Sequence, residues 1–142
     1  MEDKSRGSEV DRASAVLARM AATGHVLGCG EGWFPLISEL DRQLANLDPA
    51  YGLFRVGRVD GALVFDAKPS VPELAAQFSA LIYVTARRAS AVCEVCGGDG
   101  ELRTIHGLAE VLCAAHQAAA ERAESRRLVG RKPMGMVSDQ VP

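Results

Sequence analysis

Three stretches of the chain place apolar residues at helical intervals. The first, residues 8–23, begins at a serine, a residue that often caps helices. The second, residues 33–47, is the most regular amphipathic pattern, and Pro35 suits its first turn. The third follows a Ser-x-x-Glu capping box at Ser70 and is expected to end near Ala89. The positions on these stripes are Val10, Ala13, Leu17, Met20, Ala21, Leu36, Ile37, Leu40, Leu44, Leu47, Leu74, Phe78, Leu81, Ile82 and Thr85.

Two shorter stretches predict β-hairpins. In residues 53–67, β-favouring runs flank Asp60-Gly61, the pair that a tight two-residue turn prefers. A second hairpin is expected to join "ELRTI" to "AEVL", with its turn near His106. The glycine-rich residues 24–32 predict a loop.

The two ends of the chain lack such patterns. Residues 1–7 are polar and residues 130–142 show no period, so both are expected to be flexible. A chain of 142 residues is most simply one domain, here residues 8–129. Aromatic residues make up only 5% and many apolar positions are alanine. The core is therefore expected to be thin, and a bound metal would help to stabilise it.

No secretory or membrane-spanning segment is evident in the sequence. The first residues are polar and charged, and no apolar run approaches the roughly 18 residues that a membrane helix needs. We therefore expect a cytoplasmic protein, with no membrane partner and no small-molecule substrate indicated. In a reducing compartment, paired cysteines favour metal binding over disulfides.

Three of the four cysteines and two of the three histidines lie within residues 93–116. Cys93 and Cys96 form a C-x2-C-G knuckle, and Cys113 and His116 form a C-x2-H pair on the first turn of an expected helix. Such spacing lets two thiolates, and then a thiolate and an imidazole, converge on one ion. The sequence therefore predicts a tetrahedral Zn²⁺ site. We expect it to be structural, because catalytic zinc usually keeps one position open for water.

Knuckle, hairpin and helix follow one another as they do in treble-clef zinc folds. A zinc ribbon fits less well, because alanines follow Cys113. The expected fold class is α+β, with N-terminal helices and a β-hairpin packed on a C-terminal treble-clef-like zinc module at residues 90–129. Two alternatives stay open: buried free thiols beside a surface histidine, and Cys29 in place of His116 as the fourth ligand.

Other residues that could carry chemistry have less support. His106 lies where HNH nucleases carry a catalytic histidine. That chemistry needs a second histidine or asparagine nearby, whereas here the hairpin continues with Gly107-Leu108 and the helix offers only Gln117 and Glu121, so a turn or surface residue is the simpler interpretation. His25 and Cys29 lack a carboxylate partner, and the glycines around them lack a phosphate-loop ending. Trp33 most simply packs in the core, and a partner-facing patch is the alternative.

The formal net charge of −2 argues against electrostatic binding of nucleic acid by the protein surface as a whole. A local basic cluster does lie in residues 122–132, which hold five basic residues and one acidic residue. A solvated helix face is the simpler interpretation. Contact with phosphate is the alternative, and salt would weaken such a contact. The residues concerned are Arg122, Arg126, Arg127, Arg131 and Lys132.

Four segments of the chain, "GWFPLISEL", "FRVGRVDGALVFDA", "ARRASAVCEVCG" and "LCAAH", together resemble a known pattern. Through them, residues 30–117 are similar to a family of small, largely uncharacterised zinc-binding proteins from phages, prophages and bacteria. The middle segment of that family is usually rich in lysine and glycine, whereas "GRVDGALVFDA" lacks the lysines. The resemblance implies the zinc ligands and a phage or mobile-element character, and it implies no established activity.

Together these observations favour a non-enzymatic, zinc-stabilised binding protein that acts on another protein, as a regulator or inhibitor of phage type. The closed metal site, the near-neutral charge and the lack of an acid–base pair motivate this hypothesis. The first alternative is a nucleic-acid-binding module that uses the C-terminal helix and the basic tail. The second is an HNH-like nuclease with His106 as its general base.

Overall fold

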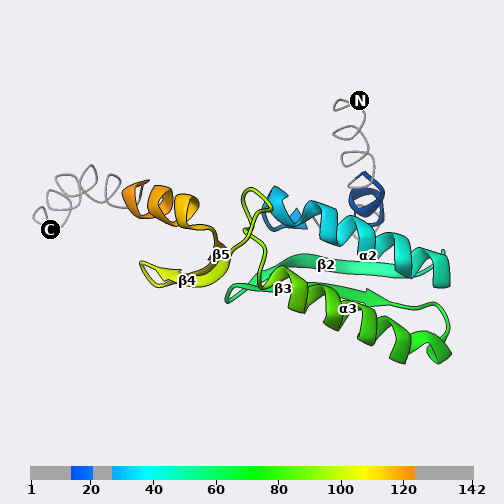
Figure 1. Cartoon of the computed structure of the whole chain (residues 1–142). Helices are drawn as coiled ribbons and strands as arrows, with labels where there is room; N and C mark the ends of the chain where they lie inside the picture. The colour runs from blue at the N-terminus through cyan, green and yellow to red at the C-terminus, as the bar shows by residue number, and fades with distance from the viewer. Residues whose placement is uncertain (1–13, 21–26, 124–142) are drawn as a thin grey trace, which may run out of the picture.

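The computed structural model describes residues 14–20 and 27–123, which form a mixed α+β fold (Figure 1). Helix is also present at residues 14–20, before the first strand, and at residues 114–123, after the last. Between them the elements are β1 (Leu27–Gly28), η1 (Glu31–Trp33), α2 (Phe34–Leu47), β2 (Gly52–Val59), β3 (Ala62–Lys68), η2 (Pro72–Leu74), α3 (Ala75–Ala89), β4 (Glu101–Ile105) and β5 (Leu108–Leu112).

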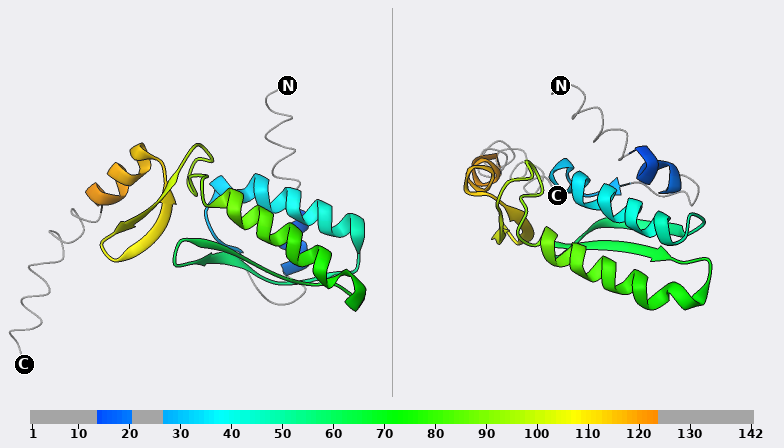
Figure 2. Two further views of the ribbon diagram at one scale, coloured as in Figure 1. Left: turned by 60° about the horizontal axis from the view of Figure 1, so that its bottom comes forward. Right: turned by 45° about the vertical axis from the view of Figure 1, so that its right-hand side comes forward.

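We call residues 14–20 and 27–91 the body, and residues 92–123 the C-terminal module. In the body, β1 pairs with β2 in parallel and β2 pairs with β3 antiparallel, giving the order β1-β2-β3. The helices α2 and α3 lie next to each other over one face of this small sheet (Figure 2). The C-terminal module projects from one end of the body (Figure 1).

Both predicted hairpins are present, and their turns explain the residues that occupy them. Asp60 and Gly61 have φ of 53° and 83°, and His106 and Gly107 have φ of 54° and 86°. Positive φ at both central residues is the geometry whose twist matches that of the flanking strands. The predicted hairpin turns are therefore confirmed.

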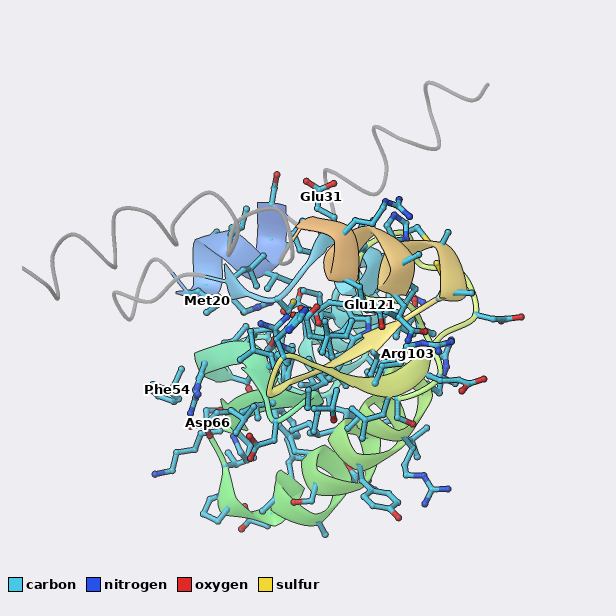
Figure 3. The ribbon with its side chains drawn as sticks, turned by 90° about the vertical axis from the view of Figure 1, so that its left-hand side faces the viewer. Met20, Glu31, Phe54, Asp66, Arg103 and Glu121 are labelled. Carbon is cyan, nitrogen blue, oxygen red and sulfur yellow. The ribbon has the colours of Figure 1, made fainter. Side chains whose placement is uncertain are left out.

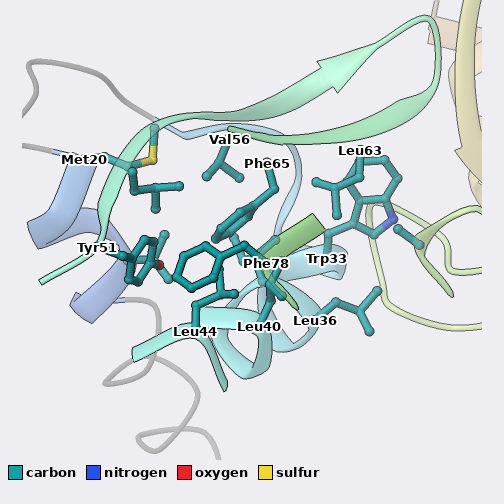
Figure 4. Packing of buried hydrophobic residues seen from close by; sticks show 14 of the residues in the cluster. Met20, Trp33, Leu36, Leu40, Leu44, Tyr51, Val56, Leu63, Phe65 and Phe78 are labelled. Atoms are coloured by element: carbon teal, nitrogen blue, oxygen red, sulfur yellow. The ribbon is translucent and has the colours of Figure 1, made fainter. Parts of the chain in front are cut away.

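The core of the body forms where the inner face of the sheet meets the helices (Figure 4). In β3, Leu63 and Phe65 are buried two residues apart, as the period of two requires. In β2, Leu53 and Val56 are buried three residues apart, because the pairing with β3 shifts between Leu53 and Arg55. Phe78 from α3 packs edge-to-face on Tyr51, with ring centroids 5.6 Å apart. The buried apolar residues of this cluster are Val16, Met20, Trp33, Leu36, Ile37, Leu40, Leu44, Tyr51, Leu53, Val56, Leu63, Phe65, Phe78 and Ala89, together with Val111 from the C-terminal module.

Some of the predicted core positions are wrong. Leu17 is 45% exposed and Leu47 is 39% exposed, while Val16 is fully buried in place of Leu17. Residues 14–20 carry a short helix whose buried side is set by its contact with the rest of the body, so the sequence period alone did not fix its rotation. The predicted positions Val10, Ala13 and Ala21 lie outside the described residues.

Two predictions about connections also need correction. The loop expected at residues 24–32 contains β1, whose Leu27 pairs with Val56 of β2. The capping box expected at Ser70 does not form. Instead, Asp48 accepts hydrogen bonds from the Ser70 amide (2.5 Å) and hydroxyl (2.9 Å), and η2 leads into α3. A long-range contact to the end of α2 therefore replaces the local cap.

Replacing Asp48 with asparagine is expected to destabilise the body at neutral pH and to matter less in acid. The Ser70 amide, followed by the Ser70 hydroxyl and the Ala50 amide, lowers the pKa of Asp48 below its ordinary value. A carboxyl with a lowered pKa contributes stability above its unfolded pKa, about 3.9, and loses it as the pH falls through the folded value. Urea denaturation of both proteins at neutral and at acidic pH measures this difference. Equal stability of the two proteins at neutral pH would contradict the role assigned to Asp48.

The C-terminal module has a small core of its own. Cys93, Ile105 and Leu112 are buried together, with Cys113 and Ala120 packed against them. This cluster is much smaller than the core of the body, so the module has little apolar burial to stabilise it. Within the described ranges, no helix has the length and apolar character that crossing a bilayer requires.

Candidate metal centre

The first pair of candidate ligands lies in a tight knuckle between α3 and β4. Cys93 is fully buried, and its backbone closes a turn in which the Gly97 amide donates to the Cys93 carbonyl at 2.9 Å. Gly97 has φ of 83°, a conformation that glycine adopts without strain. The Gly98 amide then donates to the Cys96 sulfur at 3.4 Å. The glycine of C-x2-C-G thus turns the chain so that both sulfurs lie on one side.

The second pair lies where β5 ends and the last helix begins. The Gln117 amide donates to the Cys113 carbonyl at 2.8 Å, so Cys113 caps the helix and His116 lies in its first turn. Arg103 of β4 donates to the Leu112 carbonyl at 2.8 Å and to the Gln117 side chain. Figure 3 shows Arg103 on the hairpin beside the helix that carries Glu121. These bonds fix the helix on the hairpin and aim its first turn back at the knuckle.

The four side chains converge. One ligand atom from each of Cys93, Cys96, Cys113 and His116 lies within 4.8 Å of all the others, and this group can hold a metal ion. The Nδ1 atom of His116 lies 3.2 Å from the Cys113 sulfur and 3.6 Å from the Cys93 sulfur, and the Cys96 and Cys113 sulfurs are 3.9 Å apart. None of the four cysteines forms a disulfide. In the part of the chain that the structure describes, this is the one such group of histidine, cysteine and acidic side chains.

The surroundings of these sulfurs favour thiolates. Burial raises the pKa of Cys93, but hydrogen bonds from the backbone of Cys96, Cys113 and Val95 outweigh it and lower that pKa to about 6. Backbone and side-chain hydrogen bonds from His116 lower the pKa of Cys113. For Cys96, the Gly98 amide acts in the lowering direction, but the neighbouring thiols leave its pKa raised. Since thiolates are the form that binds metal, the backbone prepares part of the group for an ion.

Cys29 is not part of this group, and the alternative that it replaces His116 is not supported. Its side chain is half-buried against the core of the body. Burial, and then the negative charge of Glu94, raise the pKa of its thiol to about 11. Cys29 is therefore a neutral thiol in the body. His25, the other candidate in that stretch, lies outside the described residues.

Glu94, which the sequence motifs did not single out, lies inside the knuckle and is only 3% exposed. Its carboxylate accepts two hydrogen bonds from Arg58 of β2, at 2.8 and 2.9 Å, and one from the Gly30 amide at 2.9 Å. Its backbone carbonyl accepts a bond from the Gly32 amide at 2.7 Å, and its amide donates to the Val111 carbonyl at 2.8 Å. Glu94 therefore joins the knuckle to the sheet and to the segment before α2. The one sequence signal for this role was its place between two ligand cysteines.

Trp33 and the glycine before it complete this junction. Trp33 is fully buried, and its indole nitrogen donates to the Val92 carbonyl at 2.9 Å. The core interpretation of Trp33 is confirmed, and the partner-facing patch is wrong because no part of the side chain reaches the surface. A Cβ atom on Gly32 would lie 2.6 Å from the Glu94 carbonyl carbon. The "GW" and "CExCG" segments are therefore packed against each other.

The remaining candidates are placed as follows. His106 is an exposed turn residue, as expected. Arg122 is exposed on the last helix. The other basic residues proposed for phosphate or partner contact, Arg126, Arg127, Arg131 and Lys132, lie outside the described residues.

Comparisons with known proteins leave the function to be inferred from this chain alone. The resemblance of residues 30–117 to a phage and bacterial family stays a prediction. Searches against protein-family models, curated proteins and solved structures gave no match to the chain.

Proposed function

We propose that Cys93, Cys96, Cys113 and His116 bind a structural zinc ion. In a tetrahedral site with Zn–S of about 2.3 Å and Zn–N of about 2.0 Å, two sulfurs lie about 3.8 Å apart and a sulfur and a nitrogen about 3.5 Å apart. The Cys96–Cys113 separation of 3.9 Å and the sulfur–Nδ1 separations of 3.2 and 3.6 Å agree with that geometry. Thiolate and imidazole together favour zinc over magnesium or calcium, which prefer oxygen ligands.

A structural role fits better than a catalytic one. Four protein ligands complete a tetrahedron and leave no position for water or substrate. The order of knuckle, β4–β5 hairpin and ligand-bearing helix supports a treble-clef-like module. The ion would also supply stability that the small cluster around Ile105 and Leu112 lacks. Elemental analysis of purified protein tests the ion. One zinc per chain is expected, and a folded module without any transition metal would refute it.

With its metal bound, the module would act as a binding surface for another protein. The observation that carries this proposal is the exposure of the hairpin leucines, which is 61% for Leu102 and 63% for Leu108. Val95 of the knuckle is 49% exposed. Apolar groups left in water on a small hairpin are typical of surfaces that a partner covers. A regulator or inhibitor of phage type is the kind of protein in which such a surface would serve.

A double variant tests the hairpin as a protein-binding surface. Immobilised wild-type chain is expected to retain a protein from host lysate that the Leu102→Ser/Leu108→Ser variant does not retain. The wild type and the double variant should both keep their metal and their fold. Val71→Ser is the matched control, because Val71 is 43% exposed on the body, before η2. Capture of only nucleic acid, released by salt or nuclease, would overturn the proposal in favour of the basic tail. Equal capture of the same protein by the double variant would overturn it too.

A further inference from the structure

The helix α3 has one buried face and one open, apolar face. Phe78, Thr85 and Ala89 point into the body. On the opposite side, Tyr83 is 61% exposed and Val84 is 54% exposed. A surface helix normally turns charged and polar residues to water, so an apolar outer face calls for a partner. Figures 1 and 2 show α3 at the outer edge of the body, with no described element over this face.

The residues of this face repeat at helical intervals along the element. They begin with Glu73 of η2 and end with Arg87 in the last turn of α3. Near the middle of this face lie two small residues, Ala76 and Ala80, and both are exposed. Small residues let a second helix approach closely, to interaxial distances of about 8 Å. The full set of exposed positions on the face is Glu73, Ala76, Gln77, Ala80, Tyr83, Val84 and Arg87.

We propose that this face pairs with the same face of a second copy of the chain, with the two α3 helices antiparallel and crossing at Ala80. A two-fold interface must be self-complementary, so each residue meets a partner at the mirrored position. About Ala80, the mirrored pairs are Glu73 with Arg87 and Ala76 with Val84. The first pair joins opposite charges, and the second joins a small side chain to a larger one. The exposed face therefore carries its own complement.

Charge and dipole both select the antiparallel arrangement. The acidic residue of the face lies at its N-terminal end and the basic residues Arg87 and Arg88 lie in the last turn of α3. A parallel pair would bring like charges together, and its helix macrodipoles, which then point the same way side by side, would repel each other. Tyr83 already accepts a hydrogen bond from Arg87 at 3.1 Å on the same helix, which holds the guanidinium over the face. In the dimer this guanidinium is then placed at the rim, opposite Glu73 of the second copy.

The dimer is expected to be weak and to leave the module free. A single helix pair buries less than the standard interface of about 800 Å² per partner, so we expect a micromolar dissociation constant. The outer face of α3 is made by residues of the body, and the C-terminal module projects beyond its end (Figure 1). A dimer would thus present two modules at once and raise the avidity of both for a partner.

Sedimentation of the full, metal-loaded chain at increasing concentration tests the pairing. The mass is expected to rise from monomer toward dimer for the wild type. Ala80→Glu, which sets two carboxylates face to face at the crossing point, should weaken the dimer by about tenfold or more. Ala75→Glu is the matched control, since Ala75 is exposed in the first turn of the same helix but lies off the face. A wild type that stays monomeric throughout, or an Ala80→Glu variant that still dimerises as the wild type does, would overturn the proposal.

A charge swap tests the antiparallel register separately. Glu73→Arg and Arg87→Glu should each weaken the dimer several-fold, because each brings like charges together across the interface. The double variant restores opposite charges at both ends and should recover dimerisation. Recovery in the double variant supports the register, because a role within one chain gives no reason for it. Failure to recover, with circular dichroism unchanged, overturns the antiparallel pairing.

Discussion

Replacing Cys113 with serine is expected to remove the bound metal and to unfold the C-terminal module, while the body stays folded. Structural zinc contributes roughly 10–16 kcal/mol of binding free energy in small zinc modules, more than most domains of this size have in total stability. The apolar cluster of the module is built on three buried residues, so little else holds it. The body keeps its own larger core, which contains no ligand of the proposed site.

Metal content and amide hydrogen exchange measure this result. We expect loss of zinc together with loss of protection in β4 and β5, and retained protection in α2, β2 and β3. Cys29→Ser is the matched control, because Cys29 is a half-buried cysteine outside the group of four. It should keep one zinc per chain. Full zinc content and unchanged melting of the Cys113→Ser variant would show that the ligand set is wrong.

The second large effect is expected from replacing Gly32 with alanine. The new Cβ would lie 2.6 Å from the Glu94 carbonyl carbon, in the backbone of the knuckle itself. Overpacking a closed site costs about 1–3 kcal/mol and sometimes more. Here the cost should lie at the upper end, because backbone cannot move aside as a side chain does. The clash also breaks the 2.7 Å hydrogen bond from the Gly32 amide to Glu94, so the module would detach from the body.

Urea denaturation of Gly32→Ala beside Gly57→Ala isolates this effect. A Cβ on Gly57 would meet its nearest atom, the Gly28 carbonyl oxygen, at 3.6 Å, which is ordinary contact. Both changes replace glycine with alanine, so their effects on the unfolded chain are alike. The variant at residue 32 should be less stable than the variant at residue 57 by about 3 kcal/mol. Equal stability of the two would mean that the knuckle does not pack on the "GW" segment as described.

Much of the fold and most of the candidate site could be predicted because their signals are local. The turn pairs at Asp60-Gly61 and His106-Gly107 need only positive φ, which the residue types themselves permit. The helix at residues 34–47 follows from a period of 3.6. The ligand pairs are three residues apart, so each pair converges whatever the rest of the chain does.

The parts that could not be predicted are those that depend on distant segments. Ser70 and Glu73 have the spacing of a capping box, yet Ser70 binds Asp48, because the end of α2 lies beside it in the fold. The rotation of the first helix, which buries Val16 and exposes Leu17, depends on the surface that it covers. β1 has two residues and exists because β2 offers an edge to pair with.

By itself, the sequence determined which residues can bind a metal, where both hairpins turn and which stretches become helices, because short spacings and backbone preferences act within a few residues. The tertiary structure alone decided how the metal-binding knuckle is joined to the body. Arg58 lies 36 residues from Glu94, and Trp33 lies 59 residues from Val92. No local pattern encodes contacts of that length, since they form only when the sheet, the "GW" segment and the knuckle have already been brought together.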